Sequence, residues 1–260
     1  MKVFFLFTKN KFLDSRLADG TVLGQILAQA LPYASGGSVV VTADHLSAAS
    51  EDQLVFVRNQ NRVRMGTGTG NLAALRACHE QGLIPKSEAC LVITDGSIVI
   101  HDYDKLAADQ EANIISLMNR AFWFRTGEDL EKLLDWQSDR PVETIQVRPE
   151  KIVSVGDVDE LVLANRRLLG IGFSSKDALE RSYTEEFGVI PPVFIHAEAE
   201  IYSSMLGPYV SIGAGAFVEN CVLENCIIDD GAHVANLNLK DSIVGRNQKI
   251  VGVPQTIIKI

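Results

Sequence analysis

The chain has 260 residues, of which 47% are hydrophobic, so it can bury the core of one large domain or two modest ones. Its formal net charge of −9 argues against a general nucleic-acid binder. No apolar run is long enough to span a membrane, and the apolar opening at 1–7 is too short for a signal peptide. The four cysteines form no C-x-x-C pair, which predicts buried free thiols and a cytoplasmic location: Cys78, Cys90, Cys221 and Cys226.

The N-terminal half alternates short apolar runs with stretches of helical periodicity. The apolar runs predict buried strands at 3–7, 38–42, 54–57 and 89–94. Helical spacing predicts helices at 21–31 and 71–80. Strands and helices in this order predict a parallel sheet with right-handed crossovers. Ligands of such sheets bind at the carboxyl ends of the strands.

Two segments are placed to lie at that edge of the sheet. The first is the glycine-rich loop that precedes the helix at 71–80: Gly66, Thr67, Gly68, Thr69 and Gly70. Glycines let a phosphate or base approach the backbone, and the following helix N-terminus favours anions, but a flexible connection explains the loop equally well. The second is Asp95, which follows a buried strand and could hold Mg²⁺ or serve as a turn residue.

The remaining part of the first 190 residues is less regular. The aromatic run at 122–124 predicts a buried strand. The mixed polar stretch at 173–188 predicts a connector that contains a short helix at 175–183.

The last quarter of the chain carries a repeat with a period near six. From Ile195 onward an aliphatic residue recurs every five or six positions, and Gly, Asn and Asp fill many of the places between. Neither a helix nor a hairpin strand has this period, whereas a parallel β-helix of hexapeptide repeats does. The pattern predicts roughly three to four stacked coils. Five aliphatic side chains should point to the coil axis: Ile201, Ile212, Val218, Ile228 and Val234.

Several segments together resemble the sugar-1-phosphate nucleotidyltransferases, in particular the glucose-1-phosphate thymidylyltransferase-like proteins with a β-helix tail. The segments at 191–195 and 206–213 are very like that family's tail, and the segment at 155–165 is similar to its motif I-G-T-P-E-D-Y-L-x-A-N. The loop at 66–72 resembles its base-contacting motif G-T-A-x-A-L, and the strand at 90–97 resembles the one that ends in its metal-binding Asp. The run at 119–124 is similar to its strand N-A-G-I-Y-V-F, which implies a strand there and a following helix at 128–136.

The resemblance implies a fold and a site. The fold would be a Rossmann-like α/β nucleotidyltransferase domain of the GT-A type at 1–172, a connector at 173–190, and a left-handed β-helix at 191–260. The site would use Arg16 and Asp95 as catalytic residues, Asp95 as the Mg²⁺ ligand, and 66–70 for the nucleotide.

The chain also departs from that family at charged positions. The family's phosphate loop, G-x-G-T-R-L-x-P-L-T followed by P-K, has only Arg16-Leu17 in common with the matching region at 8–17. The position of the second metal-binding Asp is occupied by Ser154, whose neutral hydroxyl cannot replace a carboxylate on Mg²⁺. Because phosphoryl-type transfer depends on positioning and charge neutralisation, these losses predict little turnover.

Three functional hypotheses remain open at this stage. The chain could be a homologue with lost or reduced catalysis that binds a nucleotide or nucleotide sugar as a regulatory or assembly subunit. It could be an active nucleotidyltransferase whose phosphate site uses Lys9, Lys11 and Arg16. It could also be a β-helix protein of the acyltransferase or scaffold kind, although a carbonic anhydrase of that architecture needs three histidine ligands and the repeats hold only His196 and His233.

The end of the chain suggests self-association. The last coil of a short β-helix leaves backbone edges that invite pairing, and the stretch at 250–260 is apolar. We expect this stretch to cover the coil or to join a subunit contact, which gives a homo-oligomer.

Overall fold

The computed structural model describes residues 1–8, 12–43, 46–57, 59–66, 70–108, 112–134, 144–149, 151–185 and 187–253. The chain forms two compact units. The first contains Met1–Asp14 and Leu23–Gly156, and the second contains Ser15–Val22 and Asp157–Ile260. The second unit begins at Asp157 rather than at the expected boundaries at 172 and 190, and it also includes the short segment Ser15–Val22.

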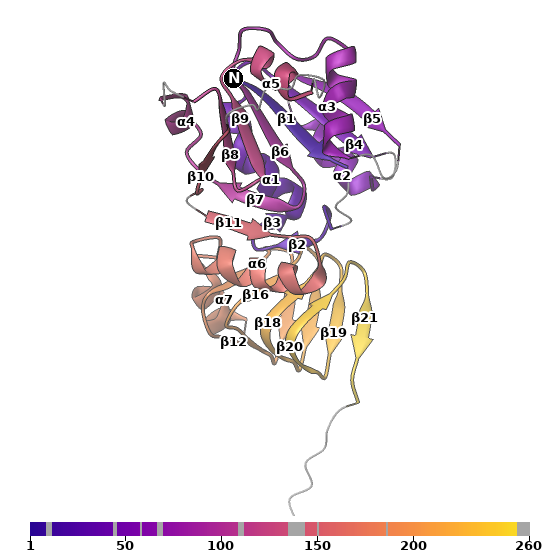
Figure 1. Cartoon of the computed structure of the whole chain (residues 1–260). Coiled ribbons are helices and arrows are strands. Elements are labelled where there is room, and N and C mark those ends of the chain that lie inside the picture. Colours follow the sequence, from indigo (N-terminus) through magenta and orange to yellow (C-terminus); the bar gives the residue numbers. More distant parts are fainter. Residues whose placement is uncertain are drawn as a thin grey trace, which may run out of the picture. The chain divides into compact units, whose positions relative to one another are not determined.

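A seven-stranded sheet with the order β10-β8-β9-β6-β1-β4-β5 forms the centre of the first unit (Figure 1). Its strands are β1 (Lys2–Phe7), β4 (Ser38–Ala43), β5 (Gln60–Met65), β6 (Cys90–Thr94), β8 (Ile114–Leu117), β9 (Ala121–Phe124) and β10 (Thr144–Val147). β1 pairs in parallel with β4 and β6, β4 with β5, and β8 with β10, whereas β9 is antiparallel to β6 and β8. Two further strands, β7 (Ser97–Ile100) and β11 (Lys151–Ser154), form an antiparallel pair.

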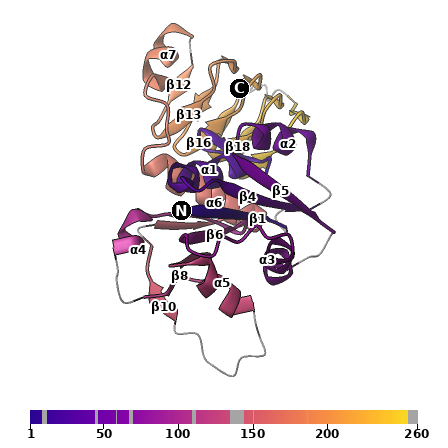
Figure 2. The same ribbon diagram turned by 90° about the horizontal axis from the view of Figure 1, so that it is seen from above.

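Helices cover both faces of this sheet, with α1 on one face and α3 and α5 on the other (Figure 2). The first unit contains α1 (Val22–Ala30), the 3-10 turn η1 (Leu31–Tyr33), α2 (Ala48–Val55), α3 (Asn71–Glu80), α4 (Asp104–Ala108) and α5 (Gly127–Leu134). Burial of β1 from Val3 to Phe7 on both faces explains its continuous apolar run. The prediction of an α/β fold with a parallel sheet is therefore confirmed.

The predicted strand at 54–57 is wrong. Leu54 and Val55 end helix α2, and the next strand is β5. The helix begins because the Ser47 side chain accepts a hydrogen bond from the Ser50 backbone N–H at 3.1 Å and so caps it. Leu54 is the apolar residue that α2 buries. A run of four apolar residues cannot distinguish a strand from the buried turn of a helix.

The predicted strand at 119–124 begins two residues late in the structure, at Ala121. Met118 and Asn119 have left-handed φ angles of 51° and 59° and form the turn between β8 and β9. Strand β8, which no pattern predicted, is the other arm of this hairpin. The expected helix at 128–136 corresponds to α5, and its last two positions lie outside the described residues.

The second unit combines two helices with short strands in two parallel sheets and one hairpin. The helices are α6 (Val158–Gly170) and α7 (Ala178–Thr184), and the hairpin consists of β2 (Arg16–Leu17) and β3 (Gly20–Thr21). One sheet contains β12 (Gly188–Val189), β13 (Val193–Ile195), β15 (Met205–Leu206), β16 (Val210–Ile212), β18 (Val222–Ile228) and β20 (Asn238–Val244). The other contains β14 (Glu200–Tyr202), β17 (Phe217–Glu219), β19 (His233–Ala235) and β21 (Lys249–Val251).

Paired strands of the second unit lie sixteen or seventeen residues apart in the sequence. Ile201 pairs with Val218, Val218 with Val234, and Val234 with Ile250. Leu206 pairs in the same way with Leu223, and Leu223 with Leu239. We call each such length of chain a turn of the stack. The side chains expected on the axis are all buried within one apolar core: Ile201, Ile212, Val218, Ile228 and Val234.

Three corners per turn carry left-handed backbone angles. The first series is Ser203, Asn220 and Asn236, the second is Tyr209, Asn225 and Asp241, and the third is Gly215, Gly231 and Asn247. Gly, Asn and Asp tolerate positive φ, which explains why they fill the places between the aliphatic residues. The corners also bond to one another, because Asn220 Nδ2 donates to Asn236 Oδ1 at 3.3 Å and Asn225 Nδ2 to Asp241 Oδ1 at 2.6 Å.

Replacement of an axial side chain should unfold the stack. We predict that Val218→Asp lowers the free energy of unfolding by about 3–5 kcal/mol, because it places an unpaired charge at a fully buried position. Urea denaturation followed by circular dichroism measures the change. Val222→Asp is the matched control, since Val222 lies on a neighbouring strand and is 50% exposed. It should cost less than about 1 kcal/mol, and equal losses in the two variants would contradict the prediction.

Candidate functional site

The strand order of the first unit reverses beside β1. The chain proceeds from β1 outward to β4 and β5, and then returns to place β6 on the other side of β1. Thr8 directly follows β1 and Asp95 directly follows β6, so both lie at the carboxyl edge of the reversal point. In open α/β sheets this is where ligands bind. We therefore define the candidate site by Thr8, Asp95 and the residues that meet them there.

The N-terminus of α3 is joined to this edge. Thr8 Oγ1 donates a hydrogen bond to Asn71 Oδ1 at 3.2 Å, which ties the end of β1 to the first residue of α3. Gly70 caps the helix and forms no side-chain hydrogen bond there. The first backbone N–H groups of an α-helix have no intrahelical partner and favour an anion.

Two of the predicted nucleotide-binding residues have open space beside them. Among the described residues other than the chain neighbours, nothing lies within 4 Å of a Cβ atom added to Gly66 or Gly70, and neither glycine has a left-handed φ angle. Neither steric crowding nor backbone conformation in the described chain therefore requires glycine here. Open space beside a helix N-terminus is what a cradle for a ligand needs. The other three predicted residues, Thr67, Gly68 and Thr69, lie outside the described residues.

Asp95 is only 4% exposed and begins the turn between β6 and β7. Ser154 on β11 pairs with Ser97 on β7, and the Val155 N–H donates to the Gly96 carbonyl at 3.2 Å. The fold thus brings Ser154 to the turn that Asp95 begins. In the described part of the chain no group of three or more His, Cys, Asp or Glu side chains could hold a metal ion.

This donor set does not fit the Mg²⁺ of a nucleotidyltransferase. A nucleotide-bound Mg²⁺ is held through carboxylates together with water and substrate phosphates. Here one largely buried carboxylate stands at the turn, and the position expected to supply a second one carries a serine. We therefore derive no step through a metal.

Sequence reasoning missed Arg120 as a residue of this edge. It ends the β8–β9 turn, and its backbone carbonyl accepts hydrogen bonds from Thr94 N at 3.3 Å and Thr94 Oγ1 at 2.9 Å. Its Nη1 would lie 3.4 Å from a Cβ atom on Gly96, so the guanidinium reaches the turn that follows Asp95. The side chain is exposed and can meet an anionic ligand. Only the antiparallel pairing of β9 with β6, which no sequence pattern predicted, brings it here.

Arg16, the other predicted catalytic residue, belongs to the second unit. Its Nη2 and Nε donate to Asp230 Oδ1 at 2.8 and 3.1 Å, and its backbone N–H donates to Asp229 Oδ2 at 3.4 Å. The side chain is 7% exposed, and its guanidinium carbon lies 5.5 Å from the centre of the Phe194 ring. Asp230 is further held by Arg246 at 2.9 Å and by the Ala214 N–H at 2.9 Å. The guanidinium of Arg16 thus forms an ion pair with the carboxylate of Asp230.

The two carboxyls beside Arg16 have opposite pKa shifts. Burial raises the pKa of Asp229 above its usual range. Burial also acts on Asp230, but the charge of Arg16 and its hydrogen bonds outweigh this and hold the pKa of Asp230 below its usual range. Asp230 is therefore ionised at neutral pH and forms the charged partner of Arg16.

The cysteines supply no nucleophile. All four are free and buried, as the sequence predicts. Burial raises the pKa of the Cys78 thiol to about 11 and that of Cys90 to about 12. Because the thiolate is the reactive form, these thiols are unreactive at neutral pH.

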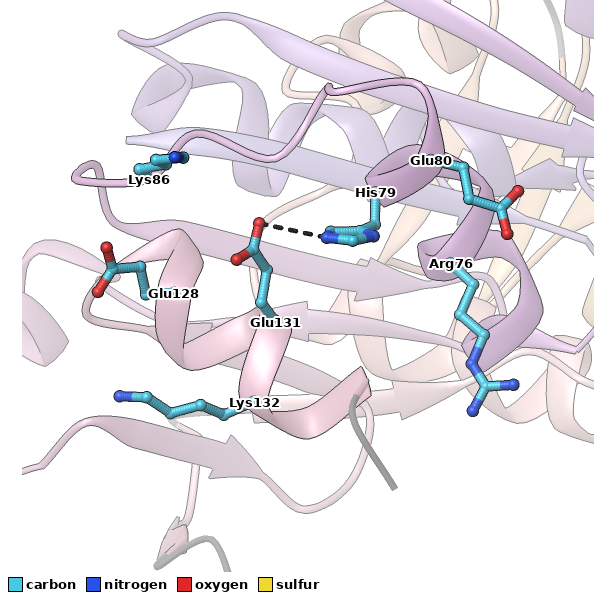
Figure 3. A pocket seen from close by; sticks show the side chains of 7 residues that line it. All are labelled: Arg76, His79, Glu80, Lys86, Glu128, Glu131 and Lys132. Carbon is cyan, nitrogen blue, oxygen red and sulfur yellow. Dashed lines mark ion pairs between the residues drawn. The ribbon is translucent and has the colours of Figure 1, made fainter. Parts of the chain in front are cut away.

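A separate open pocket of about 700 Å³ lies between α3 and α5 (Figure 3). Its lining is charged with both signs: Arg76, His79, Glu80, Lys86, Glu128, Glu131 and Lys132. His79 Nε2 and Glu131 Oε1 lie 3.5 Å apart across it. The pocket holds the C-terminal end of α3, and Lys86 precedes β6, so it lies at the edge of the sheet opposite Asp95. It is therefore distinct from the candidate site.

Comparisons with known proteins identify no close relative. No protein-family model matches the chain, and no curated protein matches it. Among solved structures, one that it resembles is a nucleoside-diphosphate-sugar pyrophosphorylase from Vibrio cholerae RC9. The likeness has a TM-score of 0.48 at 9% sequence identity and covers 63% of this chain and 99% of that one. None of the helices in the described part of the chain is long and apolar enough to cross a membrane.

Loss of Asp230 should destabilise the fold because it leaves Arg16 buried without its anionic partner. We predict that Asp230→Asn lowers the free energy of unfolding by about 2–4 kcal/mol at pH 7. The control is Glu224→Gln, which removes the exposed partner of Lys240 and should cost less than about 1 kcal/mol. Chemical denaturation of both variants measures the difference, and a cost no greater than that of the control would contradict the assignment.

The lowered pKa of Asp230 also predicts that the unfolding free energy depends on pH. Because the folded-state pKa of Asp230 is lowered, its stabilising effect is present above the unfolded pKa near 3.9 and is lost as the pH falls through the folded value. The gap in unfolding free energy between wild type and Asp230→Asn should be constant above about pH 5 and should shrink below about pH 4. Denaturation curves recorded between these limits test this, and a gap that grows with acidity would refute the lowered pKa.

Proposed function

We propose that the protein is a sugar-phosphate nucleotidyltransferase homologue that binds a nucleotide or nucleotide sugar and has lost most or all catalysis. The observation that carries the proposal is the carboxyl edge of β1 and β6. The N-terminus of α3, which Gly70 precedes, lies at this edge, and the exposed Arg120 lies beside the turn of the buried Asp95. The resemblance of the segment at 66–72 to the family's base-contacting motif supports the same assignment.

The binding half of the proposal rests on groups suited to an anion. Backbone N–H groups at the start of α3 and the guanidinium of Arg120 both favour a phosphate. The space beside Gly66 and Gly70 lets a flat base or a phosphate approach the backbone closely. A diphosphate with a nucleoside on one side is the chemical class that such an edge suits.

The catalytic half rests on missing charge neutralisation. The transferred group in phosphoryl-type reactions develops negative charge that metal ions, Lys and Arg must balance. The donor set at Asp95 does not fit a nucleotide-bound Mg²⁺, and Arg16 is already bound to Asp230. A phosphate could use Arg16 only by displacing that carboxylate. The chain can therefore hold a nucleotide more readily than it can activate one.

For the second unit we propose a short left-handed β-helix. Its support is the spacing of sixteen or seventeen residues between paired strands, with three left-handed corners in each turn. A three-sided coil is the simplest path that repeats in this way. The regulatory or assembly role would reside on the surface of this unit.

Binding at the proposed site gives a first test. Isothermal titration with nucleoside triphosphates and nucleotide sugars should find a ligand, and Arg120→Ala should weaken its binding by about tenfold through loss of a charge-assisted hydrogen bond. Gly66→Leu should weaken it at least as much, because the new side chain would fill the open space without disturbing the fold.

The matched control is Gly170→Leu at the end of α6, where an added Cβ atom also meets nothing within 4 Å. Its affinity and its melting temperature should equal those of the wild type. If no nucleotide binds at millimolar concentration, the nucleotide site does not exist and the chain is a scaffold.

Turnover gives a second test. The purified protein with Mg²⁺ and any nucleoside triphosphate and sugar 1-phosphate should release no pyrophosphate above background, because the neutralising groups are missing. Ser154→Asp restores a carboxylate beside the turn of Asp95 and should raise Mg²⁺-dependent affinity for the nucleotide. A robust wild-type rate would overturn the proposal and favour an active enzyme with an unusual phosphate site.

A further inference from the structure

The pocket between α3 and α5, which takes no part in the proposed function, carries charged side chains at both of its ends (Figure 3). Lys86 and Glu128 lie at one end, and Arg76 and Glu80 lie at the other. Its volume of about 700 Å³ is typical of a site for a small molecule. Each end therefore offers one cation and one carboxylate to a ligand of that size.

Three of the seven lining side chains already have partners. His79 Nε2 lies 3.5 Å from Glu131 Oε1 between the two ends, and Lys132 Nζ lies 3.0 Å from Asp129 Oδ1. The other four form no ion pair with any residue in the described part of the chain: Arg76, Glu80, Lys86 and Glu128. Two cations and two carboxylates thus face the pocket with their charges unpaired.

Close backbone packing sets Lys86 and Glu128 beside each other. Gly127 begins α5 against the loop that precedes β6, and a Cβ atom added there would overlap the carbonyl oxygen of Pro85. Lys86 and Glu128 are the next residues of these two segments, so their side chains leave the backbone at neighbouring points. Because they form no ion pair with each other, the gap between their charges is open to a ligand that bridges them.

We propose that this pocket binds a small zwitterion of the α-amino acid class, whose carboxylate accepts hydrogen bonds from Lys86 and whose ammonium group donates to Glu128. The two charges of an α-amino acid are separated by one carbon atom, so they can meet neighbouring side chains of opposite sign through charge-assisted hydrogen bonds. The amino-acid side chain would extend toward Arg76 and Glu80, which favours a polar or charged one.

A zwitterion suits the lining better than a metal ion or a simple anion. In the described part of the chain no group of three or more His, Cys, Asp or Glu side chains could hold a metal ion. A ligand with a single sign of charge would be attracted by one residue at each end and repelled by the other. Because the four unpaired side chains are exposed, binding should be weak and should depend on salt.

NMR titration of the full chain with the standard L-α-amino acids tests this proposal. At least one should bind with a dissociation constant below about 10 mM, and its affinity should fall as the salt concentration rises. The corresponding decarboxylated amine and deaminated acid should each bind at least about tenfold more weakly, because each lacks one of the two charged contacts.

Two variants identify which charge each residue meets. Lys86→Met and Glu128→Gln should each weaken binding of the amino acid by about tenfold. Lys86→Met should no longer distinguish the amino acid from its amine, and Glu128→Gln should no longer distinguish it from its deaminated acid. Lys176→Met, at an exposed position of the second unit, is the matched control and should leave the affinity unchanged. Because all three side chains are exposed, the melting temperatures should equal that of the wild type.

Three results would overturn the proposal. The first is the absence of binding by every L-α-amino acid at about 10 mM. The second is wild-type affinity in both Lys86→Met and Glu128→Gln, which would place the ligand elsewhere on the chain. The third is an amine or a deaminated acid that binds the wild type as tightly as the amino acid, which would show that one charge is sufficient.

Discussion

The ion pair between Arg16 and Asp230 fixes where the chain divides. The segment at 15–22, which we call the excursion, belongs to the second unit, although the residues before and after it belong to the first. Arg16 and Ala18 hold it in the second unit through hydrogen bonds. The Ala18 N–H donates at 2.9 Å to Asn165 Oδ1, which also accepts from Ser211 Oγ at 2.6 Å. Asn165 lies on α6 and Ser211 on β16, so this buried amide joins the excursion, the helix and the stack. Buried groups of this polarity are stable only when all of them are paired, so the excursion, the helix and the stack depend on one another.

This arrangement has a consequence for function. An arginine that follows the first strand of a nucleotide-binding sheet is a natural phosphate ligand, but here it neutralises a carboxylate. The guanidinium of Arg16 is thus engaged in a structural ion pair, and the position of Ser154 carries a neutral hydroxyl in a strand pair. Under the proposed function, the carboxyl edge of β1 and β6 would bind an anion through the N-terminus of α3 and Arg120.

The second unit derives its regularity from a simple constraint. A strand of three residues buries one side chain and cannot be stable alone, so each turn depends on the turns beside it. The same constraint makes the last turn incomplete. Ile250 has a neighbour on one side only, and the burial that stabilises Val218 and Val234 is unavailable to it inside one chain.

Prediction from the sequence succeeded where a local pattern has one structural solution. The continuous apolar runs of β1, β4 and β6 are rich in Val, Ile and Phe, which favour buried strands, and the helical spacing at 71–80 matches α3. It failed at 54–57, where four apolar residues fit a helix end as well as a strand. Strands β7, β8, β10 and β11 were not expected, because each has four residues and owes its conformation to pairing partners distant in the sequence.

The residues of the candidate site show the same limit of prediction from local sequence patterns. Asp95 and the glycine positions were found from the sequence, because they follow or precede recognisable elements along the chain. Arg120 was missed because only the antiparallel pairing of β9 with β6 brings it to the turn after Asp95. The sequence alone determined the α/β alternation, the period of the last quarter and the buried thiols, since each follows from local periodicity or composition. Only the tertiary structure decided that Arg16 meets Asp230, because a contact between residues 214 positions apart leaves no local pattern to read.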